Sequence, residues 1–137
     1  MTTSDLETRL GRALLVMRLS IAAFLLVWVA DKFLVPEHAQ RVFEAFYSTS
    51  PSSGMLLAAA LAQLLVVLGF TVGAFKTYSY GAILLMHAAS TVVSWKMLIN
   101  PLVVPNILFW AGIPVLGAII ALFMLREYDT LLTIKTR

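Results

Sequence analysis

The sequence predicts an all-α, polytopic membrane protein, an antiparallel bundle of four transmembrane helices with a short amphipathic helix in one outer loop. Two observations support this class. The 137 residues are 61% hydrophobic and 12% charged, whereas soluble domains carry about 45–50% apolar and about 25% charged residues. Apolar runs long enough for the ~20 residues that a helix needs to cross a bilayer recur along the chain. Four such runs with short connections use the whole length, so residues 1–137 are expected to form one transmembrane domain.

The first span is expected at about residues 13–35. It follows a polar segment in which Ser4 and Asp5 are predicted to cap a short interfacial helix. Arginines before an apolar run also fit a secretory signal, but Trp28-Val29-Ala30 is a poor cleavage site and the run continues, which favours an uncleaved span. Arg18 lies inside this span, where its long side chain is expected to reach the nearer surface as an anchor.

Pro36 ends the first span and opens the long connection over residues 36–53. Apolar residues recur there at helical spacing, opposite charged ones. The apolar positions are Val42, Phe43, Phe46 and Tyr47, and the charged ones are Glu37, Arg41 and Glu44. This pattern predicts a short amphipathic helix that lies at the membrane interface.

The second and third spans, at about residues 54–75 and 77–96, are joined by almost no chain and are therefore predicted to be antiparallel neighbours. Gln63 and His87 lie near the middle of these spans, close to the bilayer midplane, where an unpaired polar group costs several kcal/mol. A Gly69-xxx-Gly73 pair indicates close helix packing in the second span.

The fourth span is expected at about residues 102–125, after an Asn100-Pro101 turn. Pro114 lies at its centre, where the missing backbone N–H is expected to kink the helix. A polar tail that includes Arg126-Glu127 and Asp129 follows.

Basic residues are distributed unequally between the two predicted faces of the membrane. The face with the termini and the 76–77 turn carries Arg9, Arg12, Arg18, Lys76, Arg126, Lys135 and Arg137, and the other face carries Lys32, Arg41 and Lys96. This excess predicts that both termini are cytoplasmic. Because the basic residues lie at span ends, the net charge of +3 indicates topology and not nucleic acid as a partner.

Several functional classes receive no support from the sequence. There is no cysteine, which excludes disulfides and thiol chemistry. No nucleotide-binding loop or nucleophile elbow is present. The two histidines, His38 and His87, are predicted at different depths, so no metal site is expected. Whether the chain is an enzyme is left open.

A candidate intramembrane polar pocket remains, formed by His87, Gln63, Tyr80, Thr91, Arg18, Asp31 and Lys32. Two interpretations of His87 stay open. It hydrogen-bonds a quinone head group, or it is a neutral imidazole that Gln63 or a backbone carbonyl satisfies. Adjacent helical residues point about 100° apart. Asp31 and Lys32 are therefore expected to pair with other groups, such as Arg41 or Glu44, and either fix the depth of the span or form a pocket rim.

Some of these residues resemble a known family. Met17-Arg18-Leu19, followed by Trp28-Val29-Ala30-Asp31-Lys32-Phe33 and Pro36, is similar to the first span of DoxX-like membrane proteins, with an early arginine and a lysine at its outer end. Compatible later features are Asn106-Ile107-Leu108-Phe109, Pro114 and Arg126-Glu127-Tyr128-Asp129. The resemblance covers about residues 12–129. Ala30 stands where relatives often have glycine, and Gln63 where they often have an acidic residue, which weakens any proton-linked role for the second span.

The resemblance implies an inner-membrane protein whose relatives include small subunits of a thiosulfate:quinone oxidoreductase and proteins associated with oxidative-stress defence. We therefore expect a membrane subunit or partner of a redox system, with quinone as a candidate cofactor and a redox protein as a candidate partner. A non-catalytic scaffold that binds a partner protein is the alternative. A small transporter or channel subunit is the third hypothesis, and it requires a homo-oligomer because four spans with few polar residues line a pore poorly.

Overall fold

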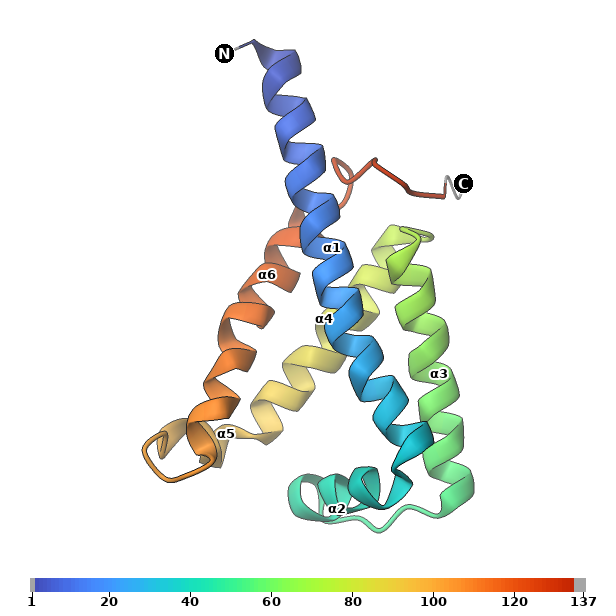
Figure 1. Cartoon of the computed structure of the whole chain (residues 1–137), viewed down its shortest axis with the longest axis vertical. Coiled ribbons are helices and arrows are strands. Elements are labelled where there is room, and N and C mark those ends of the chain that lie inside the picture. The colour runs from blue at the N-terminus through green and yellow to red at the C-terminus, as the bar shows by residue number, and fades with distance from the viewer. Residues whose placement is uncertain (1, 135–137) are drawn as a thin grey trace.

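The computed structural model describes residues 2–134 and contains seven helices and no strand in that range (Figure 1). The four long helices are α1 (Thr3–Leu34), α3 (Ser53–Thr71), α4 (Lys76–Val93) and α6 (Gly112–Met124). The three short ones are α2 (Pro36–Tyr47), α5 (Trp95–Ile99) and the 3₁₀ helix η1 (Asn106–Ala111). Lys135 and Arg137, which contribute to the predicted orientation, lie outside the described residues.

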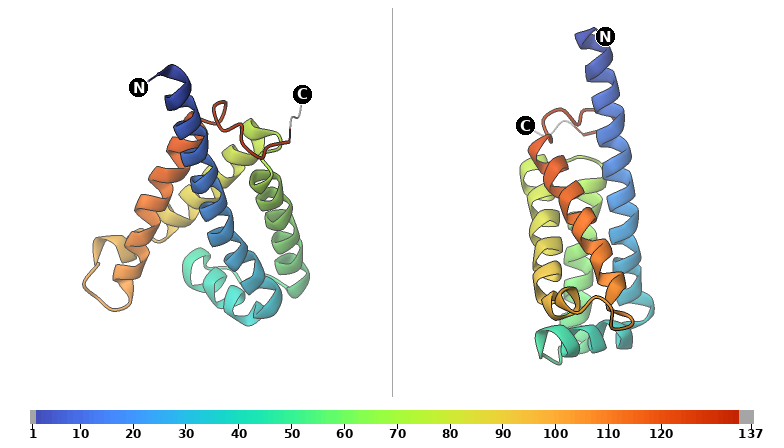
Figure 2. Two further views of the ribbon diagram at one scale, coloured as in Figure 1. Left: turned by 45° about the horizontal axis from the view of Figure 1, so that its top comes forward. Right: turned by 90° about the vertical axis from the view of Figure 1, so that its left-hand side faces the viewer.

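The long helices run between two ends of the molecule (Figures 1 and 2). We call the end with the start of α1, the α3–α4 turn and the tail that follows α6 the terminal end. The opposite end carries α2 and α5. Helix α1 packs against α3 and α6, and α4 packs against α3 and α6. The α3–α4 connection spans residues 72–75, so the predicted antiparallel hairpin is confirmed.

Three segments are long and apolar enough to cross a membrane: Thr3–Leu34, Ser53–Thr71 and Asn106–Met124, with mean hydropathies of 2.3, 2.1 and 2.4. Only 33%, 22% and 11% of their most apolar stretches are buried inside the protein, so most of their apolar side chains face outward. Apolar surface of this extent requires lipid around it. The chain is therefore an integral membrane protein. Among the described residues, α4 is not apolar enough to count as a membrane-spanning segment by the same criterion of length and mean hydropathy, because Lys76, Ser79 and His87 lower its hydropathy.

The first helix differs from its predicted bounds. The sequence favoured a separate short helix capped by Ser4, and this was wrong: α1 is continuous from Thr3. Thr2 is the cap, because its hydroxyl accepts from the Asp5 N–H at 3.2 Å while its own N–H donates to the Asp5 carboxylate at 3.1 Å. This reciprocal capping box satisfies two free donors at the helix start. The far end is as predicted, since α1 stops at Leu34 and Pro36 is the first residue of α2.

The later helices are shorter than the spans that the sequence predicted. Helix α3 ends at Thr71 and not at residue 75, and α4 ends at Val93, with α5 as a separate turn. Residues 101–105 form turns, so the last span begins at Asn106. Pro114 was also predicted at the centre of a helix, and this position was wrong. Pro114 is the third residue of α6, directly after the change from 3₁₀ to α geometry, and a missing N–H breaks no α-helical bond in a first turn.

The core lies between the four long helices. From α1 it takes residues at helical spacing, Leu14, Ile21, Ala22, Leu25 and Val29, which meet Val67, Phe70, Tyr80, Ile83, Ile119 and Leu122 from the other three. The predicted amphipathic helix is present as α2. Its Phe46 ring lies 5.7 Å from that of Phe109 in η1, which ties α2 to the start of the last span.

Candidate functional site

The structure divides the predicted pocket residues among separate hydrogen-bonded groups. Arg18 and Tyr80 come together at the terminal end, with Asp129 of the tail as their shared partner. His87 and Thr91 lie together midway along α4. Asp31 and Lys32 lie at the opposite end of α1. Gln63 is half-buried and makes no hydrogen bond with any described residue.

Arg18 is completely buried, and its Nη1 lies 3.0 Å from Oδ2 of Asp129, which is also completely buried. The predicted role of Arg18 as a surface anchor was therefore wrong. The side chain does not need to reach the membrane surface, because the tail folds back and brings a carboxylate to it. A buried charge is tolerated when an opposite charge and hydrogen bonds compensate its lost hydration.

Tyr80 completes this group, which we call the Arg18 cluster (Arg18, Tyr80 and Asp129). The Tyr80 hydroxyl donates to Asp129 Oδ2 at 2.7 Å and accepts from Arg18 Nη1 at 3.2 Å. Its ring packs edge-on against Phe70 of α3, with the centroids 4.8 Å apart. Tyr80 therefore joins the polar cluster to the apolar core.

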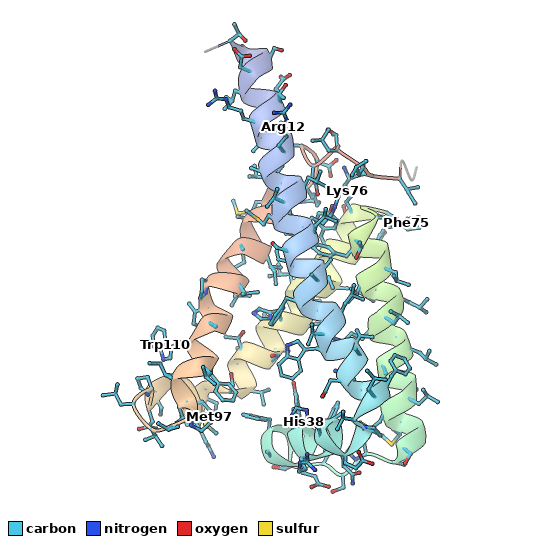
Figure 3. All side chains as sticks on the ribbon, viewed as in Figure 1. Arg12, His38, Phe75, Lys76, Met97 and Trp110 are labelled. Atoms are coloured by element: carbon cyan, nitrogen blue, oxygen red, sulfur yellow. The ribbon has the colours of Figure 1, made fainter. Side chains whose placement is uncertain are left out.

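The tail adds further contacts around the cluster. Arg18 Nη2 donates to the carbonyls of Leu131 and Leu132 at 2.6 and 3.2 Å. The Lys76 ammonium donates to the backbone carbonyl of Asp129 at 2.6 Å. Figure 3 shows Lys76 at the end where the tail lies. Helices α1 and α4 thus both hold the tail through cationic donors, and charge-assisted hydrogen bonds are stronger than neutral ones.

Gly73 makes room for this arrangement. It adopts a φ of +62°, and an added Cβ would lie 2.8 Å from Arg18 Nη1 and 2.9 Å from Thr133 Cβ. The sequence pattern with Gly69 predicted helix–helix packing, but Gly73 lies in the turn after α3. Its function in the structure is to let the turn approach the guanidinium and the tail, in a conformation that glycine adopts at low cost.

Two atoms of the Arg18 cluster have no partner. Arg18 Nε and Asp129 Oδ1 are buried and unbonded among the described residues. An unsatisfied buried polar atom costs about 1–3 kcal/mol. The cluster therefore has one donor and one acceptor to spare.

His87 hydrogen-bonds a backbone carbonyl, which is one of the two partners expected for a neutral imidazole. The carbonyl belongs to Gly112 at the start of α6 and not to the second predicted span. The Nε2–O distance is 3.0 Å. Since a carbonyl oxygen can only accept, Nε2 carries the proton, and in a neutral ring Nδ1 is then an acceptor. Nδ1 has no partner among the described residues. The Thr91 hydroxyl donates to the His87 carbonyl at 2.8 Å.

A shallow groove of about 320 Å³ runs between α1 and α6, lined mostly by apolar side chains with Ser20, Phe24 and Pro114 among them. The Phe24 ring also packs edge-on against His87, with the centroids 5.9 Å apart. Phe24 therefore contacts both the groove and the imidazole.

The charged residues at the opposite end have other partners than predicted. Asp31 Oδ1 lies 2.8 Å from His38 Nδ1, and Lys32 donates to the Trp28 carbonyl at 3.1 Å. Arg41 and Glu44 were therefore wrong as partners. Helix α2 begins two residues after α1 ends and runs across that end of the molecule (Figure 1), and His38 in its first turn contacts Asp31 in the last turn of α1. Figure 3 shows His38 at this end.

The sequence reasoning missed Asp129, Lys76 and Gly73 as site residues. A charge-balance argument points to Asp129. A buried arginine requires an acid from its own side of the membrane, and the predicted topology offers Asp5, Glu7, Glu127 and Asp129 there. Nothing in the local pattern distinguishes among these four.

Among the described residues no group of three or more histidines and carboxylates could hold a metal ion. The fold and these clusters define an integral membrane protein of the α-helical class. No protein-family model, curated protein or solved structure matches the chain. The DoxX-like resemblance therefore remains a prediction.

Proposed function

We propose that all four long helices cross the bilayer, α4 among them, with both termini in the cytoplasm of a bacterial inner membrane. The packing of α4 against α3 and α6 supports this topology, because these neighbours cover its polar residues. The distribution of charge supports the orientation. Arg9, Arg12, Lys76 and Arg126 lie at the terminal end, and Lys32, Arg41 and Lys96 at the other.

Single cysteines test this topology directly, since the chain has none of its own. Tyr78 and Trp95 are exposed residues at the two ends of α4. A membrane-impermeant maleimide applied to intact cells should label Trp95→Cys and leave Tyr78→Cys unlabelled until the cells are opened. Labelling of both variants, or of neither, in intact cells contradicts a crossing by α4.

We further propose that the protein is a DoxX-like membrane subunit of a redox system and binds the head group of a quinone at His87. The observation that carries this proposal is the unpaired Nδ1 acceptor of His87, whose ring packs against Phe24, a residue that also lines the α1–α6 groove. A quinol hydroxyl can donate to Nδ1, while an isoprenoid tail lies in the apolar groove. The electrons come from a partner protein, and this chain supplies the binding site.

The other predicted pocket residues receive no part in this site. Arg18 and Tyr80 are occupied by Asp129, the Thr91 hydroxyl by the His87 carbonyl, and Asp31 by His38. Lys32 donates to its own helix. Gln63 is unoccupied and serves as a control.

Titration of a quinone analogue in its reduced, quinol form into purified protein tests the proposal, because only the quinol carries a hydroxyl that can donate to Nδ1. His87→Ala should weaken binding about tenfold, the effect expected for one hydrogen bond of about 1.4 kcal/mol. Gln63→Ala should bind as the unmodified protein does. Equal binding by all three removes His87 from the site, and no binding by any of them rules out quinone.

A non-catalytic scaffold is the second candidate, favoured by the aromatic residues of α2. Phe43 and Tyr47 stack with their centroids 5.3 Å apart, and Tyr47 is exposed. A stoichiometric partner recovered in mild detergent, and lost on replacing Phe43 and Tyr47 by serine, supports this candidate. Recovery of the chain alone under those conditions contradicts it.

A further inference from the structure

The Arg18 cluster has the composition of an anion-binding site that the protein fills with its own tail. The donors come from helices: Arg18 from α1, and Tyr80 and Lys76 from α4. The anion comes from Asp129, in a segment that belongs to no helix. Receptor and ligand are thus separate parts of the chain, and the ligand part is peripheral to the helix core.

The tail fits this site incompletely. The side chains of Arg18 and Asp129 are completely buried, yet Arg18 Nε and Asp129 Oδ1 have no hydrogen-bond partner among the described residues. In addition, Leu132, whose carbonyl accepts from Arg18, adopts a φ of +50°, a conformation unfavourable for a leucine. The carboxylate of Asp129 therefore leaves one N–H donor of Arg18 without a hydrogen bond. The backbone of the tail is also strained at Leu132, where it binds Arg18.

Guanidinium, ammonium and phenolic hydroxyl are together the donor set of phosphate sites, because a phosphate group offers several acceptor oxygens to the planar guanidinium fork. The site also lies next to lipid. The turn that contains Gly73 continues through Ala74 and Phe75, which line a groove of about 430 Å³ between α3 and α4. An acyl chain in this groove would extend from a head group at the terminal end.

We propose that Arg18, Tyr80 and Lys76 form a phosphate-binding site for an anionic lipid head group, and that Asp129 of the C-terminal tail occupies it as a competing internal ligand. The tail then closes the site when lipid phosphate is scarce, and lipid binding displaces it. This inference does not depend on the quinone proposal, which concerns His87.

Emptying the site tests the proposal. Asp129→Asn removes the competing charge and keeps the shape of the side chain, and a chain ended after Tyr128 removes the tail altogether. Binding of phosphatidylglycerol, measured by native mass spectrometry in a phosphatidylcholine background, should be about tenfold tighter for both variants than for the full chain. The truncated chain keeps the test valid if the buried amide of Asp129→Asn impairs folding.

The double variant Arg18→Gln/Asp129→Asn is the matched control, because it has the same tail as Asp129→Asn but lacks the guanidinium. It should lose the added affinity. Unchanged lipid binding by both tail variants, or equal gain in the double variant, overturns the proposal.

A further arm distinguishes the source of the phosphate. Phosphatidylglycerol or inorganic phosphate is added at equal concentration to the full chain in phosphatidylcholine, and protection of the tail amides from hydrogen exchange is measured in each case. If phosphatidylglycerol but not inorganic phosphate displaces the tail, the ligand is a lipid. Displacement by inorganic phosphate at equal concentration supports the same site with a soluble ligand, and displacement by neither contradicts it.

Discussion

Arg18 and Asp129 lie 111 positions apart in the chain, yet their charged groups are 3.0 Å apart and completely buried. The pair joins the first membrane helix to the last described segment of the protein. A buried ion pair of this kind adds little net stability over an apolar pair, but removal of one partner is costly because the other charge is left uncompensated.

We predict that Asp129→Ala lowers the free energy of unfolding by about 3–5 kcal/mol. The double variant Arg18→Met/Asp129→Leu should recover most of this loss, since neither charge is then buried. Reversible unfolding in mixed micelles measures both. Glu127→Ala is the control, because its 3.6 Å contact with Arg126 is at the surface and such pairs contribute about 0–1 kcal/mol. Equal losses in Asp129→Ala and Glu127→Ala would show that burial of the pair does not matter.

Tyr80→Phe should lower the free energy of unfolding by about 1–3 kcal/mol, because it removes a hydroxyl that bonds a buried carboxylate at 2.7 Å. Tyr78→Phe provides a control with the same chemical change two residues away, at a position that is 79% exposed. It should be neutral. The same unfolding assay decides, and similar effects at the two positions contradict the assignment of Tyr80 to the cluster.

Gly73→Ala should destabilise by about 1–3 kcal/mol, because alanine at positive φ is strained and its Cβ collides with the Arg18 guanidinium and Thr133. Gly117→Ala is the matched variant. Gly117 lies inside α6 with no atom within 4 Å of an added Cβ, so alanine should be neutral or stabilise the helix by about 0.5–1 kcal/mol. Thermal denaturation measures both, and a similar loss of stability in the two variants would contradict the assignment.

Pro114→Ala should change stability little, by less than about 1 kcal/mol, because Pro114 lies in the first turn of α6, where no α-helical bond is lost. A proline within a helix costs about 3 kcal/mol, so a large gain on replacement would show that η1 and α6 act as one strained helix. Unfolding and helical content by circular dichroism distinguish the outcomes.

Asp31→Ala should loosen α2 from the end of α1, because it removes the 2.8 Å contact with His38. We expect faster hydrogen exchange of the α2 amides with no change in α3. Gln40→Ala, which removes only an exposed bond to Glu44 at 3.2 Å, should leave the exchange unchanged. Faster exchange in both variants would show that any substitution near α2 loosens it, and that the Asp31–His38 contact is not the cause.

Local sequence features predicted most of the elements. Pro36 terminates the first span because it cannot donate and restricts Val35, and the aromatic spacing of residues 42–47 produces α2. Helix ends were predicted less well. Gly73 takes a left-handed conformation just after the end of α3, and Phe75 takes one just before the start of α4, so the turn begins before the apolar run ends. Hydropathy carries no information on backbone conformation.

The site was predicted as a set of residue types and not as an arrangement. Rarity of polar groups in apolar helices identified Arg18, Tyr80 and His87, because each needs a partner in lipid. The partners themselves, Asp129 and the Gly112 carbonyl, depend on how the tail folds back and how α6 begins. Those are tertiary properties that periodicity does not encode.

The position of Asp129 has a consequence for biogenesis. The ribosome makes Arg18 111 residues before its carboxylate partner Asp129. Until Asp129 is made, the first helix resides at the translocon or in the bilayer with an unneutralised guanidinium, which costs about 2.5–3.5 kcal/mol at a helix centre. The buried charge of the first helix is therefore neutralised only after Asp129 has been made and the tail has folded back over Arg18.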